Sequence, residues 1–134
     1  MSQDTDLLPP TAFPPGMDNK LTLQPGEPLF KEGDLGDALY IVSQGTVQIT
    51  HEDMVYEDVE VGGILGEMAI IDEGMPRSAT AIATTHAELI KVDGAQFITL
   101  IMSAPDFALA VMRVMARRLR RMNVRVSSGH DETR

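Results

Sequence analysis

The sequence predicts a mainly β fold, an antiparallel sandwich or barrel, followed by C-terminal helices. Between residues 20 and 92, short runs rich in Val, Ile, Leu and Thr recur about every 8–12 residues, and turn residues separate them. From residue 94 onward, the apolar residues adopt the three-and-four spacing of helices. With 134 residues, of which 43% are hydrophobic, the chain has the length and apolar content of one domain.

Seven runs in the first part of the chain are expected as strands. The expected β domain has about eight strands in all, of which these seven can be delimited in the sequence. They are residues 20–23, 28–30, 38–42, 46–50, 55–61, 78–83 and 87–92. Glycine turns such as Pro25-Gly26 and Gln44-Gly45 separate them. Residues 64–76 interrupt the rhythm, so a different kind of structure is expected there.

Two helices are expected after the strands. The first spans 94–103, with Asp93 as its N-cap. The second spans 105–125 and begins with Pro105, which suits the first turn of a helix. Its apolar residues form two edges. Phe107, Val111 and Val114 are expected against the β domain, and the others follow a heptad seam that comprises Met112, Met115, Leu119, Met122 and Val126.

The two ends of the chain differ from this body. Residues 1–19 contain four prolines and no lysine or arginine, which favours a flexible, Pro-rich tail. Residues 127–134 are polar and are expected as a second tail. The folded domain is therefore expected to span 20–126.

Charge and composition exclude several classes of function. The net charge is −9, the sum of −14 over residues 1–106 and +5 over residues 107–134. An acidic body repels nucleic acid, so an anionic ligand needs a local device. The absence of cysteine excludes a disulfide scaffold and a thiolate metal site. No secretory signal or apolar run of about 20 residues is present, so a cytoplasmic protein without membrane contact is expected.

The stretch from 65 to 81 carries the chemistry. Gly66 permits a close approach of the backbone to a ligand, and a helical turn at 67–71 would offer free N–H groups to an anion. Arg77 is isolated in an acidic stretch and presents a planar fork that matches two phosphate oxygens. The Glu67 carboxylate suits a ribose hydroxyl. These residue types favour a ligand with one phosphate and neighbouring hydroxyls.

The order Gly66-Glu67-Met68-Ala69-Ile70-Ile71, five residues, then Arg77-Ser78-Ala79-Thr80 resembles a known cassette. It is similar to the phosphate-binding cassette of the cyclic nucleotide-binding domain family, in the form of a stand-alone bacterial module of the catabolite-activator type. The glycine turns upstream and the long helix downstream extend the resemblance over 20–123. It implies an antiparallel double-stranded β-roll that is jelly-roll-like.

The resemblance also implies the roles of individual residues. Arg77 would pair with the cyclic phosphate and Glu67 with the ribose 2′-hydroxyl. The implied ligand-binding residues are Gly66, Glu67, Met68, Ala69, Arg77, Ser78, Ala79, Met122 and Asn123. The last two replace a Thr-Ser pair that faces the purine in the activators. Cyclic AMP is the expected ligand and cyclic GMP, which a hydroxyl at Ser78 would favour, is the second choice. No cofactor and no metal are expected.

The expected function is a non-catalytic sensor that transmits ligand binding through the C-terminal helix. The helix at 105–126 is expected to form a homodimer or to contact a protein effector. No DNA-binding domain is expected, because the chain stops soon after this helix. The alternative is a degenerate domain that serves as an interaction or dimerisation platform without nucleotide. An enzyme of the cupin type would need two converging histidines, and His51 and His86 do not form such a pattern.

Overall fold

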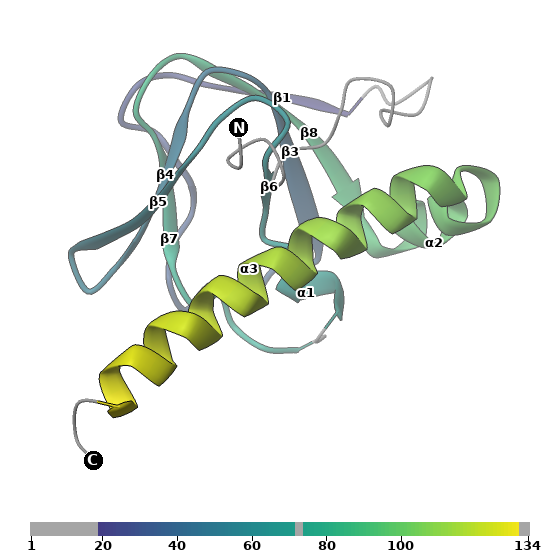
Figure 1. Cartoon of the computed structure of the whole chain (residues 1–134). Coiled ribbons are helices and arrows are strands. Elements are labelled where there is room, and N and C mark those ends of the chain that lie inside the picture. The colour runs from purple at the N-terminus through teal and green to yellow at the C-terminus, as the bar shows by residue number, and fades with distance from the viewer. Residues whose placement is uncertain (1–18, 72–73, 132–134) are drawn as a thin grey trace.

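A computed structural model describes residues 19–71 and 74–131, and over these residues eight antiparallel strands form two four-stranded sheets (Figure 1). The strands are β1 (Lys20–Leu23), β2 (Pro28–Phe30), β3 (Ala38–Gln44), β4 (Val47–His51), β5 (Met54–Val59), β6 (Ile64–Leu65), β7 (Thr80–Ala83) and β8 (Ala87–Asp93). The helices are α1 (Met68–Ile71), α2 (Gly94–Ser103) and α3 (Pro105–Asp131). The sheet orders are β1-β8-β3-β6 and β2-β7-β4-β5. The predicted antiparallel β-roll with C-terminal helices is confirmed.

Strand β3 lies between two hydrophobic cores and has apolar residues on both faces. Leu39 and Ile41 belong to a core shared with the helices, whereas Val42 belongs to the core between the two sheets. All three side chains are at most 1% exposed. Since successive residues of a strand point to opposite faces, a strand covered on both sides is a continuous apolar run.

The helices cover one face of the β1-β8-β3-β6 sheet. Phe107, Val111 and Val114 of α3 pack in the core that contains Leu39 and Ile41 of β3. This confirms the expected apolar edge of the long helix. Figure 1 shows α3 running across the β-roll from α2 toward the C-terminus.

Helix α2 begins at the cap that the sequence predicts. Asp93 Oδ1 accepts a hydrogen bond from the Gln96 amide at 2.8 Å, and the Asp93 amide donates to Gln96 Oε1 at 2.9 Å. This reciprocal capping box satisfies two amide groups that a helix start otherwise leaves without partners.

The segment boundaries differ from expectation in three places. The two-residue strand β6 lies inside 64–76, where no strand is expected, because two residues are too few to show an alternating pattern. Strand β7 starts at Thr80, since Ser78 and Ala79 form a bend. Helix α3 continues to Asp131, past the expected end at 125, and no proline interrupts this stretch.

The predictions for the two ends are left largely without a test. The Pro-rich segment 1–19 lies outside the described residues except for Asn19, and so do residues 132–134 of the polar tail.

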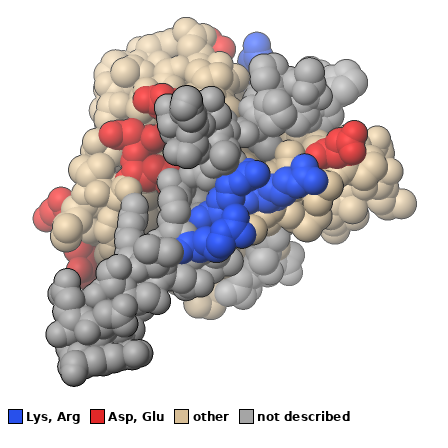
Figure 2. All heavy atoms as spheres, viewed as in Figure 1, with Lys and Arg blue, Asp and Glu red and all other residues tan. Residues whose placement is uncertain are grey.

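Charge divides between the elements as the sequence indicates. In Figure 2, basic side chains gather along α3 and acidic side chains lie over the β-roll.

Candidate functional site

Arg77 is the one charged residue that is buried among the described residues, with 8% of its surface exposed. Its Nη1 donates to the Gly66 carbonyl and its Nη2 to the Ala38 carbonyl, each at 3.0 Å. The Nε atom is buried and has no hydrogen-bond partner in the described structure. The guanidinium is thus anchored between the segment before α1 and the start of β3.

Two aromatic rings extend this anchorage. The Arg77 Cζ atom lies 4.2 Å from the centroid of the Phe30 ring and 6.0 Å from that of Tyr40. The ring at 4.2 Å is close enough for a cation–π interaction, which gains strength when the cation is removed from water. Strand β2 therefore contributes to holding the arginine.

The backbone of Arg77 is fixed as well. Its amide donates to the Asp34 carbonyl at 2.7 Å, and its carbonyl accepts from the Gly33 amide at 2.8 Å. Within the same loop, the Lys31 amide donates to Asp34 Oδ2 at 2.9 Å. The loop between β2 and β3 is therefore joined to the residue that carries the guanidinium, which restricts where the side chain can go.

The charge of Arg77 is not neutralised within the described part of the chain, where no carboxylate forms an ion pair with it. Removal of a cation from water has a large cost, and carbonyl dipoles and ring faces offset this cost less completely than an opposite charge does. An anion that reached the guanidinium would supply the missing charge.

The turn that leads into α1 is closed by its own hydrogen bonds. The Gly66 carbonyl accepts from the Ala69 amide at 3.2 Å as well as from Arg77, and the Ile70 amide donates to the Glu67 carbonyl at 3.1 Å. Gly66 has a φ of +73°, a conformation that favours glycine. The Ala69 amide, expected as a free donor for phosphate, is therefore already bonded, because the short helix closes its first turn.

The structure brings some of the predicted site residues together and leaves others apart. Gly66, Ala69 and Arg77 are brought together by the bonds described above. Glu67 is half-buried at the same turn, while Met68 is 56% exposed.

The remaining predicted residues are placed less closely. Ser78 is exposed and Ala79 half-buried in the bend that follows Arg77. Met122 and Asn123 lie in the part of α3 whose side chains fall outside the description, so their predicted contact with the purine stays a prediction.

Sequence reasoning did not find Phe30, Gly36 or Ala38, which surround the guanidinium. They precede Arg77 by about 40 residues and belong to another segment of the chain, so no local motif links them to it. The one local signal is Gly36, a glycine two residues before β3, since glycine permits close approach of another group to the backbone.

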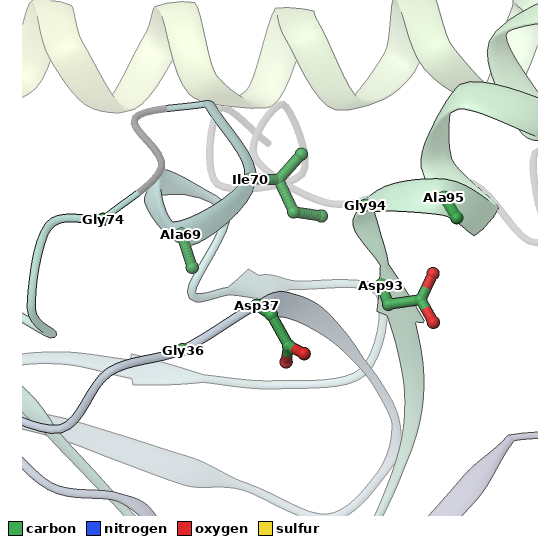
Figure 3. A pocket seen from close by; sticks show the side chains of 8 residues that line it. All are labelled: Gly36, Asp37, Ala69, Ile70, Gly74, Asp93, Gly94 and Ala95. Atoms are coloured by element: carbon green, nitrogen blue, oxygen red, sulfur yellow. The ribbon is translucent and has the colours of Figure 1, made fainter.

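A cavity of about 390 Å³ lies beside the arginine site, between α1, the loop before β3 and the start of α2 (Figure 3). It is lined by Gly36, Asp37, Ala69, Ile70, Gly74, Asp93, Gly94 and Ala95. Among the predicted site residues whose side chains the structure describes, Ala69 alone lines it. Gly36 borders both the cavity and the guanidinium, so the two features share one wall.

Two further features of the described residues concern metal ligands and membrane-spanning helices. Within 19–71 and 74–131, no group of three or more His, Cys, Asp or Glu side chains could hold a metal ion. No single helix there is both long and apolar enough to cross a membrane; α2 and α3 as far as Arg117 reach that length and composition only as a pair bent by 119°.

Comparison with known proteins identifies the family. The model of the cyclic nucleotide-binding domain matches residues 20–104, well over half of the chain, so the chain belongs to the cyclic nucleotide-binding domain family. The cyclic AMP receptor protein of Thermus thermophilus is 38% identical over 100 residues, which are 71% of this chain and 46% of the relative. The CRP-like cAMP-activated global transcriptional regulator of Mycobacterium tuberculosis is 32% identical over 103 residues, or 73% and 46%.

The fold agrees with this assignment. The crystal structure of Thermus thermophilus catabolite activator protein superimposes with a TM-score of 0.72 at 34% identity, and the match covers 81% of this chain and 53% of that one. The chain thus spans about half the length of the curated relatives it matches. They are regulators that respond to cyclic nucleotide, and the predicted family resemblance is confirmed.

These relatives correct the expected set of partners. They include transcription factors, which carry DNA-binding domains, and this chain matches less than half of their length. The expectation of no DNA-binding domain, which rests on where the sequence ends, is contradicted by these relatives. The homodimer or protein effector expected at the 105–126 helix is not tested by these relatives. Cyclic nucleotide remains the supported ligand.

Proposed function

We propose that this domain is a non-catalytic cytoplasmic sensor that binds cyclic AMP, with cyclic GMP as second choice, and transmits binding through α3. One observation carries the proposal: the buried guanidinium of Arg77 has no carboxylate partner among the described residues. A cyclic phosphate has one negative charge and two exocyclic oxygens, which suit the planar fork of an arginine. Binding would neutralise a charge that folding alone leaves uncompensated.

The remaining cassette residues would complete the contacts. Glu67, half-buried at the turn, would accept a hydrogen bond from the ribose 2′-hydroxyl. Gly66 leaves room for the ligand, and the backbone at Ser78 and Ala79 would bind the phosphate. The Ala69 amide already donates within the turn, so it would have to be shared with the ligand or released.

The preference for cyclic AMP is supported by the relatives, two of which are named for cyclic AMP. Ser78 is the feature in favour of cyclic GMP, because an exposed hydroxyl after the cassette arginine could bond to guanine. Met122 and Asn123 would face the base.

Transmission to α3 is supported by shared packing. Ile70 of α1 packs against the core to which Phe107, Val111 and Val114 of α3 belong. A ligand that moves the turn at Gly66 would move α1, and α1 can shift only if the core that it shares with α3 shifts or repacks.

The test is calorimetric titration of cyclic AMP and cyclic GMP into nucleotide-free protein, with Arg77→Ala as the main variant. Loss of a buried charged partner costs about 2–5 kcal/mol. At about 1.4 kcal/mol per decade, binding should weaken roughly thirty- to a few-thousand-fold. The matched control is Arg113→Ala, which removes an exposed arginine from α3 and should leave the affinity within about twofold.

Each outcome has a distinct meaning. Tight binding that depends on Arg77 but not on Arg113 supports the sensor and identifies the purine. Equal loss in both variants would point to nonspecific charge attraction and contradict the assigned role. Absence of heat with either nucleotide, together with an unshifted melting temperature, would favour the platform that binds no nucleotide.

A further inference from the structure

We propose that Gly36 is a positioning residue for Arg77: its missing side chain creates the space in which the guanidinium is held for an oxyanion. The inference rests on the proposed function and extends it to a residue outside the cassette. Gly36 precedes strand β3 and is separated from Arg77 by 40 positions in the sequence.

The contact is steric and specific. A Cβ atom on Gly36 would collide with Cζ, Nε and Nη2 of Arg77, well inside the 3.0 Å that real Cβ atoms keep. The three nearest atoms to that Cβ all belong to this one guanidinium. The backbone of Gly36 has no positive φ, so alanine can adopt its conformation without strain. An alanine at this position therefore acts on Arg77 first.

The guanidinium cannot yield without losing its other contacts. Its Nη1 and Nη2 bonds to Gly66 and Ala38 are both 3.0 Å long, and the Phe30 ring lies 4.2 Å from Cζ. Displacement by a methyl group would break hydrogen bonds of a charged donor and separate the cation from the ring. Gly36 thus completes a seat of which Phe30 and the two carbonyls are the other parts.

The seat determines which donors remain for a ligand. An arginine has five N–H groups, and two of them are used by the carbonyls. Nε is buried without a partner and lies among the atoms that face Gly36. Because binding of a phosphate requires donors at fixed positions, a tilt of the guanidinium would misplace those that remain. Loss of one hydrogen bond between the ligand and a charged donor weakens binding roughly ten- to a hundred-fold.

The experiment compares Gly36→Ala with Gly94→Ala as a matched control. Gly94 lines the same cavity, has no positive φ, and a Cβ there meets nothing within 4 Å. Gly36→Ala should weaken cyclic AMP binding about ten- to a hundred-fold, whereas Gly94→Ala should leave it within about twofold. Unchanged affinity in Gly36→Ala, with Arg77→Ala impaired, would overturn the inference and leave the proposed function intact.

A second readout needs no nucleotide. The Nε–H resonance of Arg77, assigned by its disappearance in Arg77→Ala, should shift strongly in Gly36→Ala and remain in place in Gly94→Ala. An unshifted resonance would overturn the positioning role. If the wild-type protein bound neither cyclic AMP nor cyclic GMP, the proposed function would fail, and this resonance would still decide whether Gly36 positions Arg77.

The double variant separates positioning from a general structural role. In an Arg77→Ala background there is no guanidinium to collide with, so Gly36→Ala should cause no further fall in melting temperature. A further fall would show that Gly36 acts independently of Arg77 and would overturn the inference. If Gly36→Ala alone does not fold, recovery of folding in the double variant supports it and failure of both contradicts it.

Discussion

Arg77 combines contacts that hold it with a charge that opposes its burial. Two carbonyl bonds and the Phe30 ring fix the guanidinium, while no carboxylate in the described part of the chain neutralises it. The net effect on stability depends on whether these dipolar contacts offset the lost hydration of a cation, and buried charges seldom reach that balance without an ionic partner. The site is therefore expected to reduce the stability of the ligand-free protein.

Replacement of this charge tests the balance directly. Arg77→Met keeps a long apolar stem near Phe30 and removes the charge. The ligand-free variant should be as stable as the wild type or more stable, by up to about 4 kcal/mol, while binding is lost. Urea denaturation without nucleotide measures the free energy of unfolding. A loss above about 1 kcal/mol would mean that the carbonyl and ring contacts outweigh desolvation.

At this scale, the sequence predicts the chemical groups better than their surroundings. Glycine, glutamate and arginine at fixed spacing indicate a phosphate site because each supplies a distinct kind of contact. The seat of Arg77 was not predictable, because Phe30, Gly36 and Ala38 reach it through the folding of β2 and β3. The bonded state of the Ala69 amide was not predictable either, because it depends on a tight bond to the carbonyl three residues earlier, that of Gly66, which closes the turn into α1.

The elements differ in how much of their stability is local. Helix α2 depends on its capping box, whose two bonds are 2.8 and 2.9 Å long. Helix α3 instead depends on packing, through side chains that are at most 2% exposed, such as Phe107 and Val111. Caps and apolar edges are periodic or local features, so both were predictable. The end of α3 and the two-residue β6 were not, because nothing local marks them.

The cap of α2 can be tested against a neighbouring carboxylate. Asp93→Ala removes the side chain that accepts from the Gln96 amide, and such a loss typically costs about 0.5–2 kcal/mol. The melting temperature should fall by roughly 4–8 °C per kcal/mol. Asp37→Ala is the control, because Asp37 lines the same cavity but is exposed and forms no cap, and it should change stability by less than about 0.5 kcal/mol. Equal losses in the two variants would contradict the assigned role of the cap.

One hydrophobic core of the described residues connects the proposed ligand site to helix α3. Leu39 and Ile41 of β3 contribute to this core from the sheet, and Phe107 and Val111 contribute from α3. Ile70 packs against it from α1, two residues before the described chain is interrupted. Since close-packed cores transmit displacement, a change at the Gly66 turn has a continuous physical route to α3.

Ile70→Ala should separate binding from transmission. The variant removes the α1 side chain that packs on the shared core but leaves Arg77 and its seat in place. Cyclic AMP should bind within about tenfold of the wild-type affinity, because the phosphate contacts do not involve this side chain. The change in hydrogen exchange that the nucleotide causes over residues 107–114 should fall to less than half.

Hydrogen exchange with mass detection measures both states, and Met68→Ala is the control, since Met68 lies in the same helix with 56% of its surface exposed. Loss of the α3 response in Ile70→Ala but not in Met68→Ala would establish the route through the core. The reason is that Ile70→Ala truncates a side chain that packs against the core, whereas Met68→Ala truncates an exposed side chain of the same helix. An α3 response that persists in both would show that the motion of α1 is not required and that the nucleotide affects α3 by another route, such as the predicted contact with Met122 and Asn123.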